Sequence, residues 1–310
     1  MRPNQLIDPT ELARISNLEL LARTVVEGLG TGIHRSPQTG TSIEFAQYRP
    51  YAQGDDLRFL DWKLFGRSDR LHLKQFQDET NLTCTVMLDC SASMAYGSGS
   101  ITKFDYARML AASIATILNK QGDRCGLVAY HREIVCHLPP RGDRSALRRL
   151  IVTLDGLDAA ETTDTSGALH FLGDIIKPRG MVILIADLLH PLDVVLGHLK
   201  SLRARRHDVL VLQICDPAER DFPFDRSVTL QDLEAELEQF VVPSAVREGY
   251  LENRRQHFET IRRECLAAEI DLAEFSCDQP LDFALRHFLR RRVRALKTSG
   301  LIRSHGGATA

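Results

Sequence analysis

VMLDCSASM, residues 86–94, is the stretch of sequence that decides how the chain folds. An apolar run typical of a buried strand ends at Asp89, and two hydroxyl residues, Ser91 and Ser93, follow at a spacing of two. An aspartate followed by serine at a strand end is also a common turn and helix-capping arrangement. The stretch alone therefore leaves two interpretations open, a metal site and a simple turn.

The sequence that follows residue 81 alternates between strand patterns and helix patterns. Strands are predicted at 82–89, 125–130, 134–138, 181–187, 208–214 and 271–275, and helices at 103–120, 144–154, 166–176, 191–204, 246–267 and 280–292. Fully apolar strands that alternate with helices of this length predict a doubly wound, mostly parallel sheet of the Rossmann type, covered on both faces. The second and third strands are so close in sequence that 134–138 is expected to form one antiparallel edge strand.

The N-terminal part of the chain has a different character. Apolar residues recur at helical spacing over 8–29, and the region after it is irregular apart from a short strand predicted at 71–76. We therefore expect three parts: a small helical and irregular subdomain at 1–80, the α/β domain at 81–296, and a flexible tail at 297–310.

Composition excludes several classes of function. The 310 residues carry 39 basic and 41 acidic side chains, so a net charge of -2 offers no general attraction to nucleic acid. The sequence shows no signal-peptide pattern and no apolar run near the roughly 20 residues of a membrane span, which predicts a cytoplasmic protein. Seven cysteines are scattered without a C-x-x-C pair, which favours neither a disulfide framework nor a zinc site.

Two predicted strands end on a carboxylate, Asp89 after VML and Asp187 after VILIA. Because ligands of doubly wound sheets collect at the carboxyl ends of the strands, both side chains are expected in one solvent-facing crevice. Ser91 and Ser93 would present hydroxyls there. Carboxylate and hydroxyl oxygens form a hard-oxygen site that suits Mg²⁺.

The D-x-S-x-S pattern of LDCSASM resembles the metal-ion-dependent adhesion site of von Willebrand factor type A domains. That resemblance implies a von Willebrand factor A-like domain that binds Mg²⁺, or Mn²⁺, and leaves an open coordination position for an acidic side chain of a partner. Glu161 and Thr162 stand where that family usually has a glycine before its threonine, so Thr165 is an alternative to Thr163. The metal ligands it implies are Asp89, Ser91, Ser93, Thr163 and Asp187.

Residues 44–79, EFAQYRPYAQGDDLRFLDWKLFGRSDRLHLKQFQDE, resemble the hallmark of the bacterial domain-of-unknown-function 58 family. GDRCGLVAY at 122–130, DLE at 232–234 and REGYLE at 247–252 extend the resemblance, which runs from about residue 32 to 292. Members of that family have no known enzymatic activity and tend to be encoded beside MoxR-type AAA+ ATPases. The resemblance implies an adaptor that acts with such an ATPase or presents its client.

One dense block of charged residues surrounds the sole tryptophan. A structural interpretation, with the tryptophan packed beside an ion-pair network, is favoured over a partner-docking surface. The block consists of Gly54, Asp55, Asp56, Arg58, Asp61 and Trp62.

Three functions compete. We favour a non-enzymatic, metal-dependent protein-binding adaptor. A magnesium-dependent phosphohydrolase with Asp89 as nucleophile would need a second carboxylate as acid and base, and Ser91 occupies its place. A structural scaffold with an inactive metal site is the third possibility.

Overall fold

The computed structural model describes residues 18–30, 39–50, 64–66, 71–77, 82–176, 179–189, 193–234 and 238–298. Contacts divide the chain into two compact units, Met1–Gly32 with Leu82–Arg291, and Ile33–Asn81 with Arg292–Ala310. The first unit includes helix α2 (Leu18–Gly30), which packs on helix α4 (Lys103–Lys120). The predicted division instead grouped this helix with the rest of residues 1–80.

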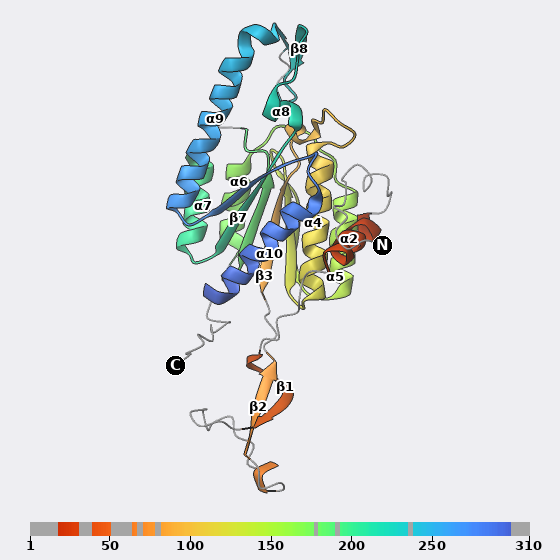
Figure 1. Ribbon diagram of the computed structural model, residues 1–310, viewed down its shortest axis with the longest axis vertical. Coiled ribbons are helices and arrows are strands. Elements are labelled where there is room, and N and C mark those ends of the chain that lie inside the picture. The colour runs from red at the N-terminus through yellow and green to blue at the C-terminus, as the bar shows by residue number, and fades with distance from the viewer. Residues whose placement is uncertain are drawn as a thin grey trace, which may run out of the picture. The chain divides into compact units, whose positions relative to one another are not determined.

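The first unit is built on a six-stranded sheet of order β10-β7-β6-β3-β4-β5. All neighbouring strands run parallel except β4 and β5, which are antiparallel (Figure 1). This topology confirms the predicted doubly wound sheet with one antiparallel edge. The strands are β3 (Thr83–Asp89), β4 (Arg124–Tyr130), β5 (Ile134–Arg141), β6 (Met181–Ala186), β7 (Asp208–Cys215) and β10 (Asp271–Ser276).

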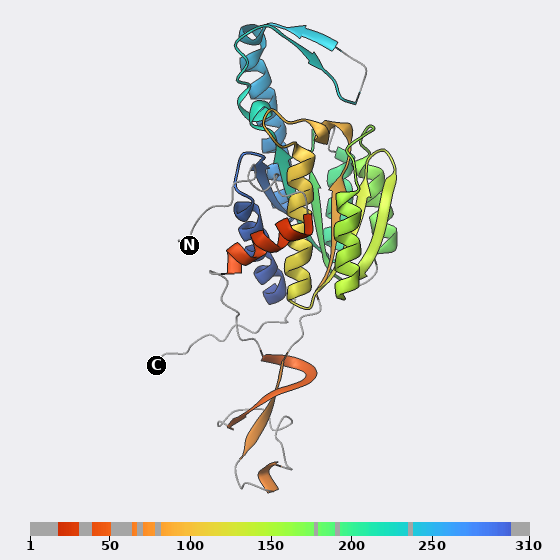
Figure 2. The ribbon, with the colours of Figure 1, turned by 90° about the vertical axis from the view of Figure 1, so that its right-hand side faces the viewer.

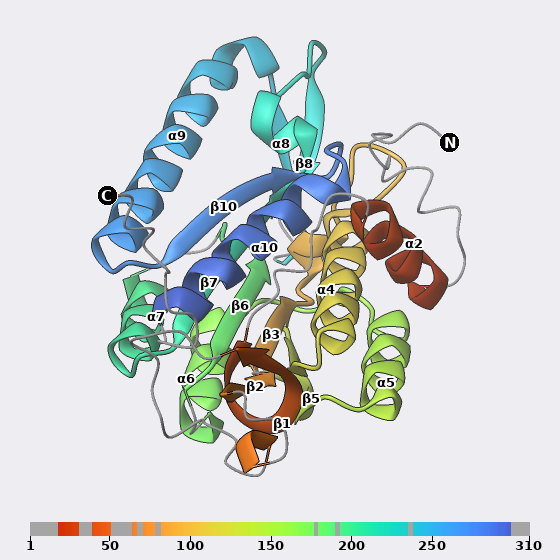
Figure 3. The ribbon, with the colours of Figure 1, turned by 60° about the horizontal axis from the view of Figure 1, so that its bottom comes forward.

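Helices cover both faces of this sheet (Figures 2 and 3). The helices are α5 (Arg144–Asp155), α6 (Thr165–Ile175), α7 (Asp193–Ala204), α9 (Pro243–Ala267) and α10 (Leu281–Thr298), together with α4. Side chains of α6, α7 and α9 share one apolar core with β6 and β7, whereas α4 contacts the sheet from the other face. Every residue of β6 is buried, which explains why its sequence is apolar throughout rather than alternating.

Local signals fix where the central helix begins. The Thr102 hydroxyl accepts a hydrogen bond from the amide of Asp105, and the Asp105 carboxylate accepts one from the amide of Thr102. This reciprocal arrangement satisfies two backbone donors that a helix start leaves without partners. It places Lys103 in the first turn of α4, directly after the loop that carries Ser91 and Ser93.

Several elements were not predicted. They are the 3-10 turn η2 (Ala92–Ala95), helix α8 (Pro217–Asp221) and the antiparallel hairpin of β8 (Val228–Gln231) and β9 (Glu238–Val241). In the second unit, β1 (Thr39–Pro50) was also missed, and it pairs with β2 (His72–Gln77) where a short strand was predicted.

Two predicted terminal features fall partly outside the described residues. The expected N-terminal helix at 8–29 appears as α2 from Leu18, and residues 8–17 lie outside the described part of the chain. Helix α10 extends to Thr298, past the predicted end at 292 and into the predicted tail, whose remaining residues are not described. Over the described ranges, no helix has the length and apolar character that crossing a membrane requires.

Gly126 in β4 offers a test of how tightly the antiparallel edge is packed. A Cβ atom at this position would lie 2.7 Å from the carbonyl oxygen of Leu138 and 2.8 Å from the backbone nitrogen of Pro140. Because neighbouring backbone would have to shift, we expect Gly126→Ala to lower the free energy of unfolding by about 1–3 kcal/mol. Urea denaturation followed by circular dichroism would measure the change.

Gly249, in the second turn of α9, provides the matched control. A Cβ atom there meets nothing within 4 Å, and alanine is the better helix former, so Gly249→Ala is expected to raise the stability by about 0.5–1 kcal/mol. Equal destabilisation by both substitutions would contradict the packing argument.

Candidate metal centre

The candidate site lies where the strand order of the sheet reverses. From β3 the chain proceeds to β4 on one side, whereas β6 pairs with β3 on the other side, and such switch points are where doubly wound sheets bind ligands. Asp89 is the last residue of β3 and Asp187 directly follows β6. Leu88 lies opposite Ile185 in the parallel ladder, so both carboxylates stand at the same end of adjacent strands.

The two carboxylates are far less accessible than predicted. Asp89 is fully buried and Asp187 is only 2% exposed, so the expectation of a solvent-facing pair is wrong. Backbone hydrogen bonds join the loop that follows β3 to the loop that precedes α6. Changes at these aspartates therefore act in a buried environment.

The serine loop is tied to Asp89 by a backbone hydrogen bond. The amide of Ser91 donates to Asp89 Oδ1 over 2.9 Å, and the hydroxyls of Ser91 and Ser93 lie 3.1 Å apart. Backbone hydrogen bonds from Ala92 to Glu161, and from Ala160 to Cys90, join this loop to the one before α6. The pattern D-x-S-x-S thus forms a turn and also gathers hydroxyl oxygens beside a carboxylate.

Thr163, rather than Thr165, is the threonine that reaches Asp89. Its Oγ1 donates to Asp89 Oδ2 over 3.3 Å, whereas Thr165 Oγ1 lies 3.2 Å from the hydroxyl of Tyr130. The backbone of Glu161 has a φ of 64°, a left-handed conformation that glycine adopts most easily. Glu161 therefore adopts the turn without glycine, at a cost of about 1–2 kcal/mol.

A buried lysine that sequence reasoning missed completes the site. Lys103 Nζ lies 2.8 Å from Asp187 Oδ2 and 2.6 Å from Glu219 Oε1, and its side chain is fully buried. Burial by itself lowers the pKa of Lys103, but the Asp187 and Glu219 carboxylates outweigh it and hold that pKa above the ordinary value. Lys103 is therefore a permanent cation beside Asp187.

Asp89, by contrast, has no ion-pair partner among the described residues. Burial, and then the negative charge of Asp187, raise the pKa of Asp89 to about 7, although hydrogen bonds from Ser91 and Thr163 lower it. A buried carboxylate next to another is costly unless a cation offsets it.

The oxygens of this site suit a hard divalent cation. The site has more carboxylates than ammonium groups, since Lys103 is its one cation among the described residues, and the hydroxyls supply neutral oxygens. Within the described ranges, no cluster of three or more His, Cys, Asp and Glu side chains is placed to hold a metal ion of any kind. The predicted set of Asp89, Ser91, Ser93, Thr163 and Asp187 fits magnesium chemistry, with Lys103 holding one oxygen of Asp187.

Helix α8 connects the site to the C-terminal part of the first unit. Asp216 follows β7, caps α8 together with Glu219, and accepts a hydrogen bond of 2.9 Å from the amide of Ser98 in the loop after η2. A third strand that ends on aspartate, in DPAE at 216–219, was a signal that sequence reasoning could have used. Lys103 left no comparable signal, because one lysine at a helix start usually faces solvent.

The predicted charged block around the sole tryptophan cannot be compared with the structure. The block of Gly54, Asp55, Asp56, Arg58, Asp61 and Trp62 falls outside the described residues.

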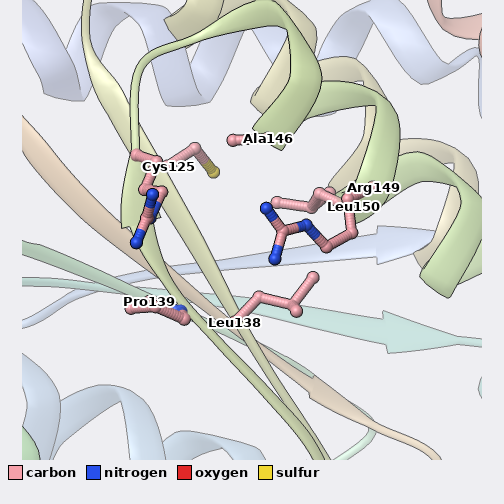
Figure 4. A pocket seen from close by; sticks show the side chains of 7 residues that line it. Cys125, Leu138, Pro139, Ala146, Arg149 and Leu150 are labelled. Atoms are coloured by element: carbon pink, nitrogen blue, oxygen red, sulfur yellow. The ribbon is translucent and has the colours of Figure 1, made fainter.

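A small pocket of about 50 Å³ lies between β5 and α5, where Figure 4 shows Cys125, Leu138 and Arg149 around it. Cys125 is near the beginning of β4, so this pocket is at the opposite end of the sheet from Asp89.

The sheet order and the strand-end carboxylates define a doubly wound α/β domain with two buried acids at its switch point. Residues 47–260 match the family model described as protein of unknown function DUF58, and the chain belongs to this family. It is 28% identical over 262 residues to an uncharacterized protein of Mycobacterium bovis and, equally, to one of Mycobacterium tuberculosis, covering 83% of this chain and 81% of each relative.

The solved structures that match this chain are more distant in sequence. BatB from Bacteroides thetaiotaomicron matches with a TM-score of 0.48 and 12% identity, over 70% of this chain and 99% of that one. The SpRpn10 VWA domain matches with a TM-score of 0.42 and 10% identity, over 66% of this chain and 95% of that one.

Proposed function

We propose that this chain is a non-enzymatic adaptor that binds a partner protein through a divalent cation, Mg²⁺ or Mn²⁺. The observation that supports this function most is the meeting of Asp89, Ser91 and Thr163 at the switch point of the sheet, next to Asp187. A bound cation would supply a coordination position for a carboxylate of the partner. The residues of this chain would hold the ion and exclude water around it.

The arrangement of charges supports binding over hydrolysis. A phosphohydrolase that used Asp89 would need a free carboxylate as acid and base. Asp187 and Glu219, two carboxylates beside the site, are both engaged by Lys103. The Ser91 side chain, which stands where the second carboxylate of such enzymes would be, meets the hydroxyl of Ser93.

The partner is proposed from the family resemblance. We infer that it is a MoxR-type AAA+ ATPase, or a client of that ATPase, which presents an acidic side chain to the site. In this role the chain would act in complex maturation or chaperone-like work in the cytoplasm.

Pull-down with a MoxR-type ATPase encoded in the same genome tests this function. The ATPase should be retained by the immobilised chain in Mg²⁺ and released by EDTA, and Asp89→Asn should abolish retention. Asp174→Asn, a change of an exposed carboxylate on α6, should leave retention intact. Retention in EDTA would contradict a cation-mediated contact, and hydrolysis of p-nitrophenyl phosphate that Asp89→Asn removes would favour the phosphohydrolase.

A further inference from the structure

A basic groove lies among helices α2, α4 and α5, which Figure 3 shows side by side. This α2–α4–α5 groove has a volume of about 380 Å³, and the C-terminal end of α4 and the first turns of α5 contribute to its walls. Helix α4 starts after the end of β3 and finishes just before the start of β4. The groove is therefore at the opposite end of the sheet from Asp89.

Four cationic side chains and one carboxylate line the α2–α4–α5 groove. The carboxylate, Glu19, contacts Arg23 one turn along α2. Lys120, Arg144 and Arg148 form no ion pair with an acid that the structure describes. The groove thus has an excess of positive charge, in a chain whose acidic side chains outnumber its basic ones. Such a local excess favours an anionic occupant.

Hydrogen bonds fix the two helix ends that form the groove. Asn119 Nδ2 donates to the carbonyl oxygen of Gly142 over 2.7 Å, which ties the end of α4 to the start of α5. The carboxylate of Asp143 caps α5 by accepting from the amide of Ala146 over 2.8 Å, and Asp143 does not line the groove. The acid at the start of α5 is used for capping, so the cations of the groove stay available to a ligand.

Two of the arginines stand where their charges oppose helix formation. Arg144 and Arg148 are four residues apart on α5, so they share one face of the helix, and like charges at this spacing destabilise it. Both side chains are exposed. A contribution to folding through ion pairs does not explain this pair of arginines, whereas an anion bound in the groove would offset their repulsion.

The lining of the groove favours carboxylates over nucleic acid. Guanidinium groups bind carboxylates through two parallel hydrogen bonds. Leu147 is the one apolar side chain among the described residues of the lining, and no aromatic ring stands among them to stack on a base. A nucleic acid would gain charge contacts alone. An acidic segment of a protein would gain paired hydrogen bonds to the arginines as well.

We propose that the α2–α4–α5 groove is a docking surface for an acidic segment of a partner protein, rich in aspartate and glutamate. The contacts are direct ion pairs with Lys120, Arg144 and Arg148, so they need no bound cation. This surface is separate from the candidate metal centre. An adaptor with both surfaces would hold two proteins at once, one at each end of the sheet.

A fluorescein-labelled octapeptide of alternating glutamate and serine tests the proposal on the full chain. Fluorescence anisotropy in EDTA measures its affinity without a contribution from bound cations. The test variant combines Arg144→Gln with Arg148→Gln. The matched control combines Arg262→Gln with Arg263→Gln, which removes the same charge from two exposed positions of α9. Labelled octathymidylate is the second probe, and it presents negative charge on a nucleic acid.

The octapeptide is expected to bind the wild type, and to bind the Arg144 and Arg148 double variant roughly 3- to 30-fold more weakly. The control double variant should stay within about twofold of the wild type. Asp89→Asn should bind the octapeptide as tightly as the wild type, because Asp89 is at the other end of the sheet. The Arg144 and Arg148 double variant should unfold at the same urea concentration as the wild type or a higher one, since a repulsion is removed.

Three results would overturn the proposal. If the wild type did not bind the octapeptide, the groove would not be a surface for acidic segments. Equal losses of affinity in the two double variants would show that the peptide responds to net charge rather than to the groove. Tighter binding of octathymidylate that the Arg144 and Arg148 double variant loses would assign the groove to nucleic acid. The proposed metal contact is tested separately, by retention of the ATPase in Mg²⁺.

Discussion

Replacing Lys103 by methionine is expected to lower the free energy of unfolding by about 3–5 kcal/mol, the largest effect on stability that we expect at the site. Methionine keeps the apolar stem of the side chain but removes the ammonium. Asp187, 2% exposed, and the partly buried Glu219 would then be left without the cation that both contact. Urea denaturation at neutral pH in EDTA measures the effect without a contribution from bound cations.

Lys200→Met is the matched control for this prediction. Lys200 Nζ lies 2.8 Å from Glu264 Oε2, the same separation as in the pair of Lys103 and Asp187, but both side chains are substantially exposed. Solvent screens such a pair, so its loss should cost at most about 1 kcal/mol. If the two variants lost similar amounts of unfolding free energy, burial of the Lys103 ion pair would not increase its contribution to stability.

The same ion pair changes what is expected of Asp187. If Asp187 faced solvent, as the sequence predicts, Asp187→Ala would weaken partner binding without unfolding the domain. The structure places Asp187 against a buried lysine, so this substitution removes one of the two charges that compensate Lys103. Asp187→Ala is therefore a poor test of the metal, because lost stability and lost ligation would coincide.

The fold could be predicted because its signals are local. Six consecutive buried residues in β6, and the closely spaced strands β4 and β5, are visible in sequence as apolar runs and a short gap. The convergence of Asp89 with Thr163 also followed, since both flank elements of a predictable topology. Hairpin β8–β9 left no such signal, because strands of four mostly exposed residues carry no apolar period.

Long-range polar contacts explain the remaining failures. Lys103 meets Glu219 across 116 residues, and Glu234 meets Thr163 across 71, and no spacing rule links residues so distant. Each of these side chains is of a type that is usually solvated, so the default expectation for it was exposure. Sequence reasoning named residues that the structure brings together, Asp89 and Thr163 among them, but not the charges that surround them.

Asp89→Asn is expected to weaken Mn²⁺ binding by more than about 100-fold. Mutation of residues that only orient metal ligands already lowers metal affinity by about 10- to 100-fold, and loss of a ligand should cost more. Asparagine has the same shape, and its amide oxygen can still accept from the amide of Ser91. The substitution removes a negative charge from beside Asp187 and leaves no cation unpaired, since Lys103 contacts Asp187 and Glu219 instead. Calorimetric titration with Mn²⁺ would measure the loss.

The stability of this variant separates ligation from folding. In EDTA, Asp89→Asn should unfold at the same urea concentration as the wild type or a higher one, because a buried charge with a like-charged neighbour opposes folding. Weak Mn²⁺ binding by a fully stable Asp89→Asn variant would thus report loss of a ligand. Asp174→Asn should change neither measurement, since that carboxylate is exposed on α6. An Asp89→Asn variant that binds Mn²⁺ as tightly as the wild type would rule out Asp89 as a ligand.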